Sequence, residues 1–119
     1  MKTITYTVDF KNVTNQTEIG LRIRQSLKCF PSVSEEIYIE RVRRGLSSSW
    51  DALNDDLSGL PNELTDSGTE EVTLILTNTK DIVANISQEE YDHMISILDN
   101  LTLPSERIDN LKFSYIIQS

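Results

Sequence analysis

The chain has 119 residues, of which 38% are hydrophobic, and it contains one cysteine and one histidine. This length and composition favour a single domain over 1–119 that can bury a core without disulfides or metal ions. Cys29 alone can form neither an internal disulfide nor a cysteine-based zinc site, and His93 alone excludes most multi-histidine metal sites.

The formal net charge is −8, and it is unevenly distributed. Residues 1–45 carry eight Lys and Arg against five Asp and Glu, whereas 46–119 carry three against fourteen. Such acidity repels nucleic acid and anionic membranes, and it attracts a basic protein at low salt. Because acidity also keeps proteins soluble, composition alone leaves both interpretations open.

The sequence predicts a cytoplasmic protein. Residues 1–6 lack the apolar core of a signal peptide, and no stretch approaches the roughly 20 apolar residues of a membrane span. We expect no cofactor, no bound metal, and neither nucleic acid nor membrane as a partner.

The first elements follow from apolar periodicity. Alternation over 3–10 predicts a strand with Ile4 and Val8 on its inner face. Asn15 followed by Glu18 predicts the N-cap of a helix that Pro31 ends. The apolar residues of this helix recur on one face: Ile19, Ile23, Leu27 and Phe30.

Residues 32–44 leave a strand, a helix and a long loop all open. They end in the one basic cluster of the chain, Arg41-Val42-Arg43-Arg44. In an acidic chain, three arginines indicate a solvated patch or internal ion pairing rather than a nucleic-acid site.

The stretch 45–60 predicts the central helix. Three serines can cap its start and Gly59 can end it. Its apolar stripe recurs at helical period: Trp50, Leu53, Leu57 and Leu60. A different side gathers the polar residues Asp51, Asn54, Asp55 and Ser58. We expect the apolar side to be anchored and the acidic side to be offered to a partner.

The second half predicts a loop over 61–69 and then a short strand, Val72–Leu76. The nearly continuous apolar character of this strand indicates a strand covered on both faces. Ser87-Gln88-Glu89-Glu90 is a capping box, and the helix that it starts is bounded by Pro104. Alternation over 111–117 predicts the last strand. Strands separated by helices favour parallel pairing, so the predicted fold is α/β, a small three-stranded parallel sheet covered by helices.

Catalytic signatures are weak in this sequence. Four isolated glycines form no phosphate loop, and His93 lies on the polar side of a predicted helix, as surface histidines do. Asp51, Asp55 and Asp56 lie on one helix, whereas hard cations usually need ligands from several elements. The presence of Asp51 is explained by its place in the first turn, where the helix dipole favours a negative charge. Asp55, four residues on, repels it by a few tenths of a kcal/mol, which a cationic partner would offset.

These residues resemble a known family. Trp50-Asp51-Ala52-Leu53-x-Asp55-x-Leu57 followed by Gly59 is similar to the second-helix motif of the barstar family of intracellular ribonuclease inhibitors. The order of the predicted elements is also similar over nearly the whole chain. The resemblance implies an α/β inhibitor whose second helix and preceding loop block a nuclease active site.

The resemblance also implies the residues that bind the partner. Asp55 matches the principal carboxylate of these inhibitors, and Asp51 matches the secondary one. Neighbouring interface positions correspond to Asn54, Ser58, Gly59 and Leu60, with Gly45 and Ser48 in the preceding loop. Trp50 is expected to pack rather than to bind, and Asp99 is the nearest candidate for an acidic residue on the helix before the last strand.

This chain departs from the family in its lead-in to the motif. The linker 31–49 is longer than usual and basic, and an aromatic-Gly-x-Asn lead-in is replaced by Arg44-Gly45-Leu46-Ser47-Ser48-Ser49. Bulky aromatic residues are absent at Asn54 and Leu60. The partner should therefore differ from the one that the family usually binds.

The expected function is that of an immunity protein: a non-catalytic monomer that binds a basic nuclease toxin, ribonuclease being the family default, in a 1:1 complex. One alternative is an interaction module whose basic partner is not a nuclease. Another is a small enzyme with Asp51 and Asp55 as acid–base carboxylates, which would need a concave pocket around them.

Overall fold

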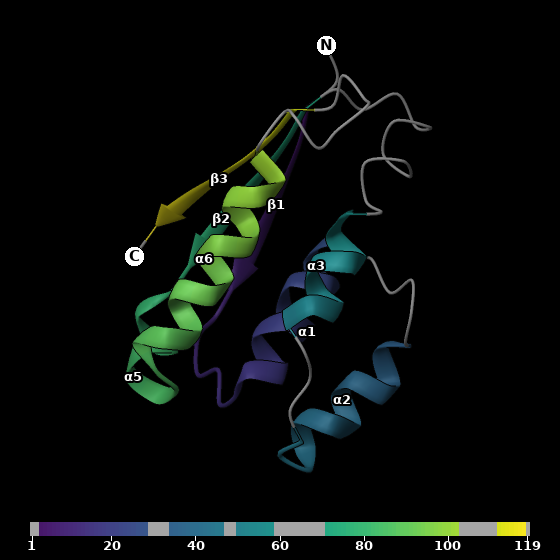
Figure 1. Ribbon diagram of the computed structural model, residues 1–119, viewed down its shortest axis with the longest axis vertical. Helices are drawn as coiled ribbons and strands as arrows, with labels where there is room; N and C mark the ends of the chain where they lie inside the picture. The colour runs from purple at the N-terminus through teal and green to yellow at the C-terminus, as the bar shows by residue number, and fades with distance from the viewer. Residues whose placement is uncertain (1–2, 29–33, 47–49, 59–70, 103–111, 119) are drawn as a thin grey trace.

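The structure is a computed structural model that describes residues 3–28, 34–46, 50–58, 71–102 and 112–118. The elements run in the order β1 (Thr3–Asp9), α1 (Gln16–Leu27), α2 (Glu35–Arg43), α3 (Trp50–Ser58), β2 (Glu71–Thr77), α5 (Lys80–Asn85), α6 (Gln88–Thr102) and β3 (Lys112–Gln118) (Figure 1). Among these residues, no helix combines the length and apolar character needed to cross a bilayer.

The three strands form one sheet in the order β1-β2-β3, and both pairings are parallel. Ile4 pairs with Val72, and Val72 with Phe113, so the apolar residues of neighbouring strands share one face. A strand must cross over to run parallel to its predecessor, and helices make both crossovers here. The predicted small α/β fold with a three-stranded parallel sheet is confirmed.

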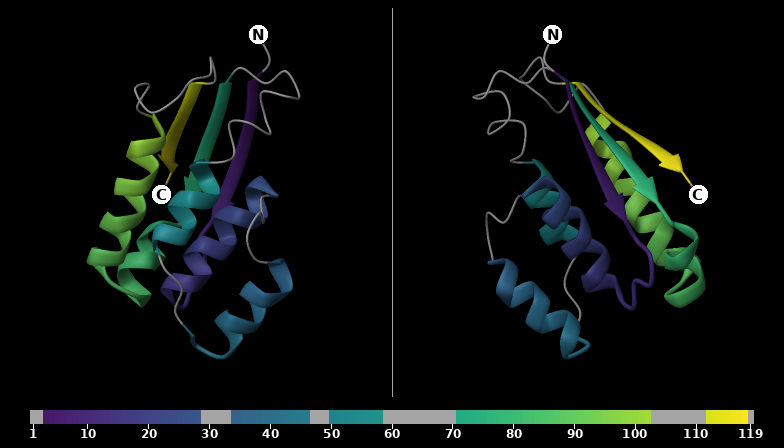
Figure 2. Two further views of the ribbon diagram at one scale, coloured as in Figure 1. Left: turned by 45° about the vertical axis from the view of Figure 1, so that its right-hand side comes forward. Right: turned by 180° about the vertical axis from the view of Figure 1, so that it is seen from behind.

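The helices lie on one side of this sheet. Seen from behind, the strands stand in front of α6, with no helix drawn across them (Figure 2). Burial agrees, because Val72, Leu74 and Leu76 are buried, whereas the alternate residues of β2 are half-exposed. The expectation that β2 is covered on both faces was wrong. Three of its four outward positions are polar, namely Glu71, Thr73 and Thr77, so the strand alternates more than its apolar residues suggested.

The first helix begins as predicted and ends earlier. Asn15 accepts a hydrogen bond from the Glu18 backbone N–H at 2.9 Å, and the Glu18 side chain accepts one from Thr14. The helix closes at Leu27, where Lys28 adopts a left-handed conformation with φ 54°. The end predicted at Pro31 was therefore too late, and Phe30 lies outside the described residues.

Two helices were not predicted. The open stretch 32–44 contains α2, which Gly45 ends with φ +70°. There, the Gly45 N–H bonds to the Val42 carbonyl and the Leu46 N–H bonds to the Arg41 carbonyl, the paired bonds of a Schellman motif. The other helix, α5, has six residues and follows β2. Only Tyr38 of α2 is buried, so the apolar residues of this segment do not recur clearly at a helical spacing.

A buried ion pair joins α1 to α3. Arg24 Nε donates to Asp56 Oδ2 at 2.7 Å, and the two side chains are 1% and 2% exposed. The Arg24 guanidinium carbon lies 4.2 Å from the centroid of the Tyr38 ring on α2. Burial raises the pKa of Tyr38. Helices α1, α2 and α3 therefore meet at one cation.

Gly20 lies one turn before Arg24, and its lack of a side chain makes room for this cation. A Cβ on Gly20 would come within 2.8 Å of Arg24 Nη1. We expect Gly20→Ala to destabilise the protein, although alanine is favoured in helices by ~1 kcal/mol. In an Arg24→Ala background the same change should stabilise the protein by up to that ~1 kcal/mol. Urea unfolding of the four variants measures the sign; stabilisation in the wild-type background would contradict the close fit.

Candidate functional site: the acidic face of α3

The apolar side of α3 is anchored in the core. Leu53 and Leu57 are buried, and Trp50 is partly buried and packs against the same cluster. The Trp50 indole N–H donates to Glu90 on α6 at 2.7 Å, and its ring meets His93 edge-on at a centroid distance of 6.0 Å. These contacts agree with the expectation that Trp50 packs rather than binds.

The three aspartates of α3 lie in two different environments. Asp51 and Asp55 are exposed, whereas Asp56 is buried against Arg24. None of the ion pairs among the described residues involves Asp55. Residues four apart on a helix have Cβ atoms ~5–6 Å apart on one face. We call the surface formed by Asp51, Asn54 and Asp55 the acidic face of α3.

The other residues of the predicted interface are only partly placed. Asn54 is half-exposed on the same helix, and Gly45 is exposed at the end of α2. Its left-handed conformation gives this glycine a structural reason that is independent of any partner. Ser58 ends α3, and its side chain is not described. The remaining predictions, Ser48, Gly59 and Leu60, lie outside the described residues.

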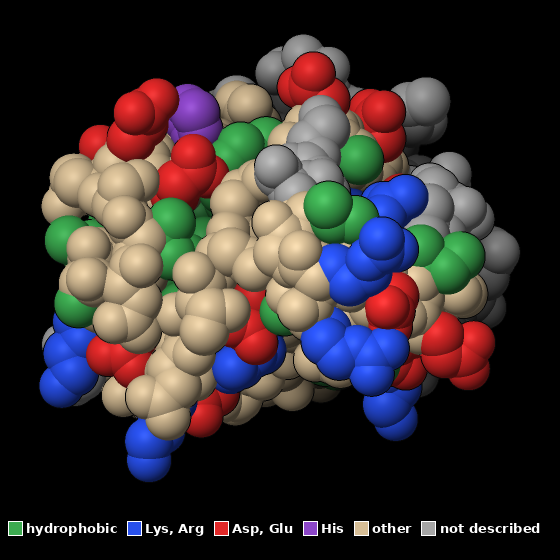
Figure 3. Space-filling model, turned by 90° about the horizontal axis from the view of Figure 1, so that it is seen from below, with side chains coloured by type: hydrophobic (Ala, Val, Ile, Leu, Met, Phe, Trp, Pro, Cys, Tyr) green, Lys and Arg blue, Asp and Glu red, His purple; other side chains and the backbone are tan. Residues whose placement is uncertain are grey.

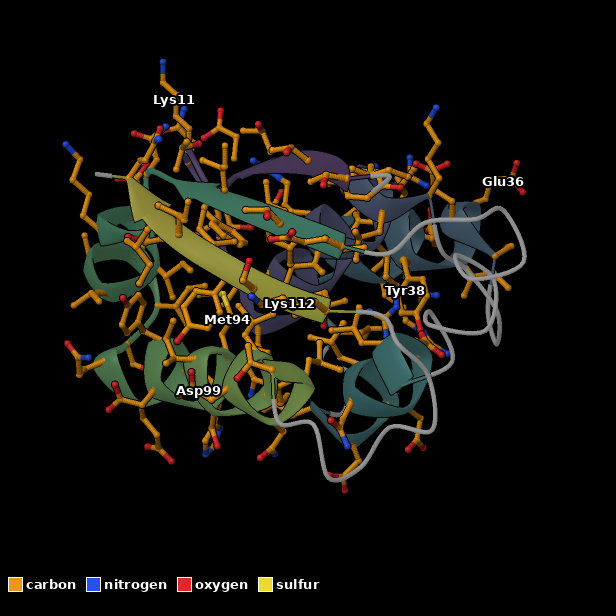
Figure 4. All side chains as sticks on the ribbon, turned by 90° about the horizontal axis from the view of Figure 1, so that it is seen from above. Lys11, Glu36, Tyr38, Met94, Asp99 and Lys112 are labelled. Carbon is orange, nitrogen blue, oxygen red and sulfur yellow. The ribbon has the colours of Figure 1, made fainter. Side chains whose placement is uncertain are left out.

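Asp99 lies apart from this face. Its carboxylate accepts a hydrogen bond from the Tyr115 hydroxyl on β3 at 2.5 Å. Glu90, which contacts α3, is nine residues earlier, and two and a half helical turns place the two side chains on opposite sides of α6. In Figure 4, Asp99 is labelled on α6, away from Tyr38 and α3. The structure therefore does not bring Asp99 together with Asp51 and Asp55.

The contact with Asp99 changes the titration of Tyr115. The hydrogen bond to Asp99, followed by burial and the carboxylate charge, raises the pKa of Tyr115 to about 12. A raised pKa means that the neutral phenol contributes stability that is complete below pH 10 and is lost as pH rises through about 12. We expect Asp99→Ala to return the Tyr115 pKa toward 10, measured by ultraviolet titration of tyrosinate. Asp92→Ala, which removes another exposed carboxylate of α6, should leave the late ionisation unchanged.

The neighbour of the acidic face is the other side of α6. Glu90 and His93 contact Trp50 there, and Glu89 is exposed on the same turn. In the view from below, carboxylates gather beside the histidine at the upper left with no Lys or Arg among them (Figure 3). In the lower half, acidic and basic side chains alternate. The acidic face of α3 thus adjoins a second acidic surface.

Asp56 was considered with Asp51 and Asp55 as a candidate cation ligand. The structure assigns it instead to Arg24, whose charge already balances it. Among the described residues, no group of three or more His, Cys, Asp or Glu side chains is arranged to hold a metal ion. The exposed carboxylates of the acidic face of α3 can accept hydrogen bonds from the ammonium or guanidinium groups of another molecule.

Sequence reasoning missed Arg24 and the second role of Glu90. Arg24 lies one turn after Gly20 and next to the apolar stripe of α1, and a small residue four positions before an arginine is a weak signal for a buried guanidinium. Glu90 was assigned to the capping box of α6, and the Ser87 hydroxyl does accept from its N–H at 3.1 Å. Its carboxylate, however, turns to Trp50, a contact between residues 40 positions apart.

The basic cluster at the end of α2 is partly paired internally. Arg43 forms an ion pair with Glu40, and the Arg41 guanidinium lies 5.6 Å from the Tyr38 ring centroid. Both contacts lie within α2, as expected for a solvated and internally paired cluster.

No family model, no curated protein and no solved structure matches this chain. The resemblance to the barstar family therefore depends on the residues of α3 and on the order of the elements. It stays a prediction.

Proposed function

We propose that this protein is a cytoplasmic immunity protein that binds a basic nuclease toxin and blocks its active site with the acidic face of α3. The complex is 1:1, and ribonuclease is the first class of toxin to test. The protein performs no chemistry itself; it competes with the nucleic acid for the cationic groups of the enzyme.

The single observation that carries this proposal is the division of the aspartates on α3. Burial of Asp51 and Asp55 would have contradicted it; both are exposed, whereas Asp56 is buried against Arg24. A nine-residue helix thus carries exposed carboxylates on one side and Leu53 and Leu57 in the core on the other. This arrangement supports a helix that is held in place and presented to a partner.

The physical basis of inhibition is imitation of phosphates. A nuclease site collects Lys and Arg side chains to bind the polyanionic substrate, and two carboxylates one turn apart offer those cations charge-assisted hydrogen bonds. The cost of removing the carboxylates from water is offset only when the partner pairs them well. A rigid helix limits the entropy lost on binding.

Identification of the partner tests the proposal. The tagged chain serves as bait in total protein from the organism that encodes it, beside an Asp51→Ala/Asp55→Ala variant. Proteins that the wild type retains and the variant loses are identified by mass spectrometry. They are then assayed for cleavage of RNA and DNA with and without one equivalent of the chain. We expect a nuclease whose activity is abolished by that equivalent.

The alternatives give different results in the same assay. A retained basic protein without nuclease activity would favour an interaction module with another partner. A nuclease that remains active in the saturated complex would exclude occlusion of its active site. Equal retention by wild type and double variant would remove the acidic face of α3 from the interface.

Salt should act on association more than on dissociation. The acidic surfaces of α3 and α6 attract a cationic partner over distances that salt screens, about 10 Å at 0.1 M ionic strength. From 50 to 500 mM NaCl we expect the association rate constant to fall about tenfold or more and the dissociation rate constant to change by less than about threefold. Stopped-flow fluorescence of Trp50 measures both. An association rate that does not depend on salt would contradict electrostatic attraction.

A further inference from the structure

Asp55 and Asp56 are neighbours on α3, yet they lie in opposite environments. Asp55 is exposed, whereas Asp56 is only 2% exposed. Successive residues of a helix point about 100° apart, so only one of the two can face α1. The aspartate that is buried therefore defines the direction in which the acidic face of α3 points.

The apolar anchors of α3 leave some freedom of rotation. Hydrophobic burial has no preferred direction, so Leu53 and Leu57 can stay in the core while the helix turns slightly about its axis. With a radius of ~5 Å, a turn of ~20° moves a side-chain end by ~2 Å. Binding groups usually have to be held within about 10–20° of their productive geometry. Directional contacts are needed to hold α3 that closely, and the Trp50–Glu90 hydrogen bond supplies one at the first residue of the helix.

Arg24 supplies a directional contact. Its Nε donates to Asp56 Oδ2 at 2.7 Å, and its guanidinium also lies close to one further element, α2, and to its own helix. The Tyr38 ring of α2 lies 4.2 Å away, and Gly20 of α1 approaches so closely that an added Cβ would stand 2.8 Å from Nη1. Figure 4 labels Tyr38 on the side of the molecule where α3 lies. A shift of the cation would lengthen the hydrogen bond to Asp56 or the contact with the Tyr38 ring.

The energetics favour a role in positioning over one in stability. Both charges are almost fully removed from water, at 1% and 2% exposure. Within the described part of the chain, Arg24 Nη1 and Nη2 have no hydrogen-bond partner. Apolar residues of similar volume often stabilise a protein as well as such a pair does, or better. They would fill the same space but would impose no direction on the helix.

We propose that Arg24 is a positioning residue: by binding Asp56 it fixes the rotation of α3 and so makes Asp51 and Asp55 the outward pair. The consequence for binding rests on the function proposed above, whereas the orientation of α3 does not depend on any partner. Arg24 itself touches no partner, because it is buried.

The test replaces the ion pair by an apolar pair, Arg24→Met with Asp56→Leu. Residual dipolar couplings of the Cα–Hα bonds report how α3 is rotated relative to the sheet, with no partner present. We expect the double variant to unfold cooperatively, with a melting temperature within about 5 °C of wild type or above it. We expect the couplings of α3 to fit a rotation of ~20° or more, or to be averaged, while those of β2 stay unchanged. Arg22→Met, the same change at a partly exposed position of α1, should leave the couplings of α3 at their wild-type values.

Two outcomes overturn the inference. Couplings of α3 that match wild type in the double variant would show that the rotation is set by packing and the Trp50–Glu90 hydrogen bond, without Arg24. A double variant that no longer folds would show that the pair is needed by the fold itself rather than for positioning.

Binding separates this inference from the proposed function. With the nuclease in hand, the double variant should bind at least ten times more weakly than wild type at equal stability. Unchanged couplings together with unchanged binding would remove the role of Arg24 and leave the proposed function standing. Rotated couplings in a protein that binds no nuclease would remove the proposed function and leave Arg24 as the residue that orients α3.

Discussion

Replacing Asp55 by alanine should weaken binding to the nuclease by more than ~2 kcal/mol, which is a loss of about 30-fold in affinity. The carboxylate is exposed and takes part in none of the ion pairs among the described residues, so its charge is available to a partner. Removal should leave the partner's cations buried and unpaired, which is what makes such truncations costly. Isothermal titration calorimetry or inhibition of cleavage measures the change.

Two controls give the Asp55 result its meaning. Asp92→Ala removes the same charge from an exposed position of α6 and should cost less than ~0.5 kcal/mol, as rim charges do. The free energy of unfolding of Asp55→Ala should equal that of wild type, because an exposed side chain contributes little to folding. An affinity unchanged by Asp55→Ala would remove this residue from the interface, whatever Asp51 does.

Replacing Arg24 by alanine should lower the free energy of unfolding by about 3–5 kcal/mol. The change leaves the Asp56 carboxylate 2% exposed in a site without its cation, and it opens the space between α1 and the Tyr38 ring. Small domains have only ~5–15 kcal/mol of stability, so the variant should be close to unfolding at 37 °C. Urea denaturation followed by tryptophan fluorescence measures the loss.

The matched control is Arg22→Ala, two residues before Arg24 on the same helix. Arg22 pairs with Glu18 at 3.4 Å in partly exposed surroundings, and surface pairs of this kind contribute ~0–1 kcal/mol. A loss below ~1 kcal/mol for Arg24→Ala would mean that Asp56 reaches water, either directly or after α3 rearranges. The buried pair would then contribute little to the free energy of unfolding.

Local signals predicted the elements that carry strong caps and clear periods. Asn15 and Ser87 mark the starts of α1 and α6, and each accepts the backbone hydrogen bond that its position requires. The alternation over 3–10 and 111–117 predicted β1 and β3 for the same reason, since a period of two has no helical equivalent. Where the period is weak, as in α2 with one buried residue, the sequence left three structures open.

In the candidate site too, the sequence predicted what depends on neighbouring residues and missed what depends on distant ones. The motif of α3 predicted a helix with Leu53 and Leu57 inside and Asp51 and Asp55 outside, and burial agrees. It left Asp56 outside this polar side but could not show what holds this carboxylate, because its cation lies 32 residues earlier on α1. It could not place Asp99 either, because the side of α6 that this residue occupies depends on β3.

By itself, the sequence determined the parallel α/β order, the inner stripes of α1 and α3 and the acidic character of α3, since these depend on neighbours within a few residues. Only the tertiary structure decided which aspartate faces the core and on which side of the sheet the described helices pack. Both depend on contacts between distant segments: Arg24 with Asp56, and the packing of all the helices near the sheet onto one face. A local sequence pattern shows the type of an element and its apolar face, but it does not show which distant residues contact that element.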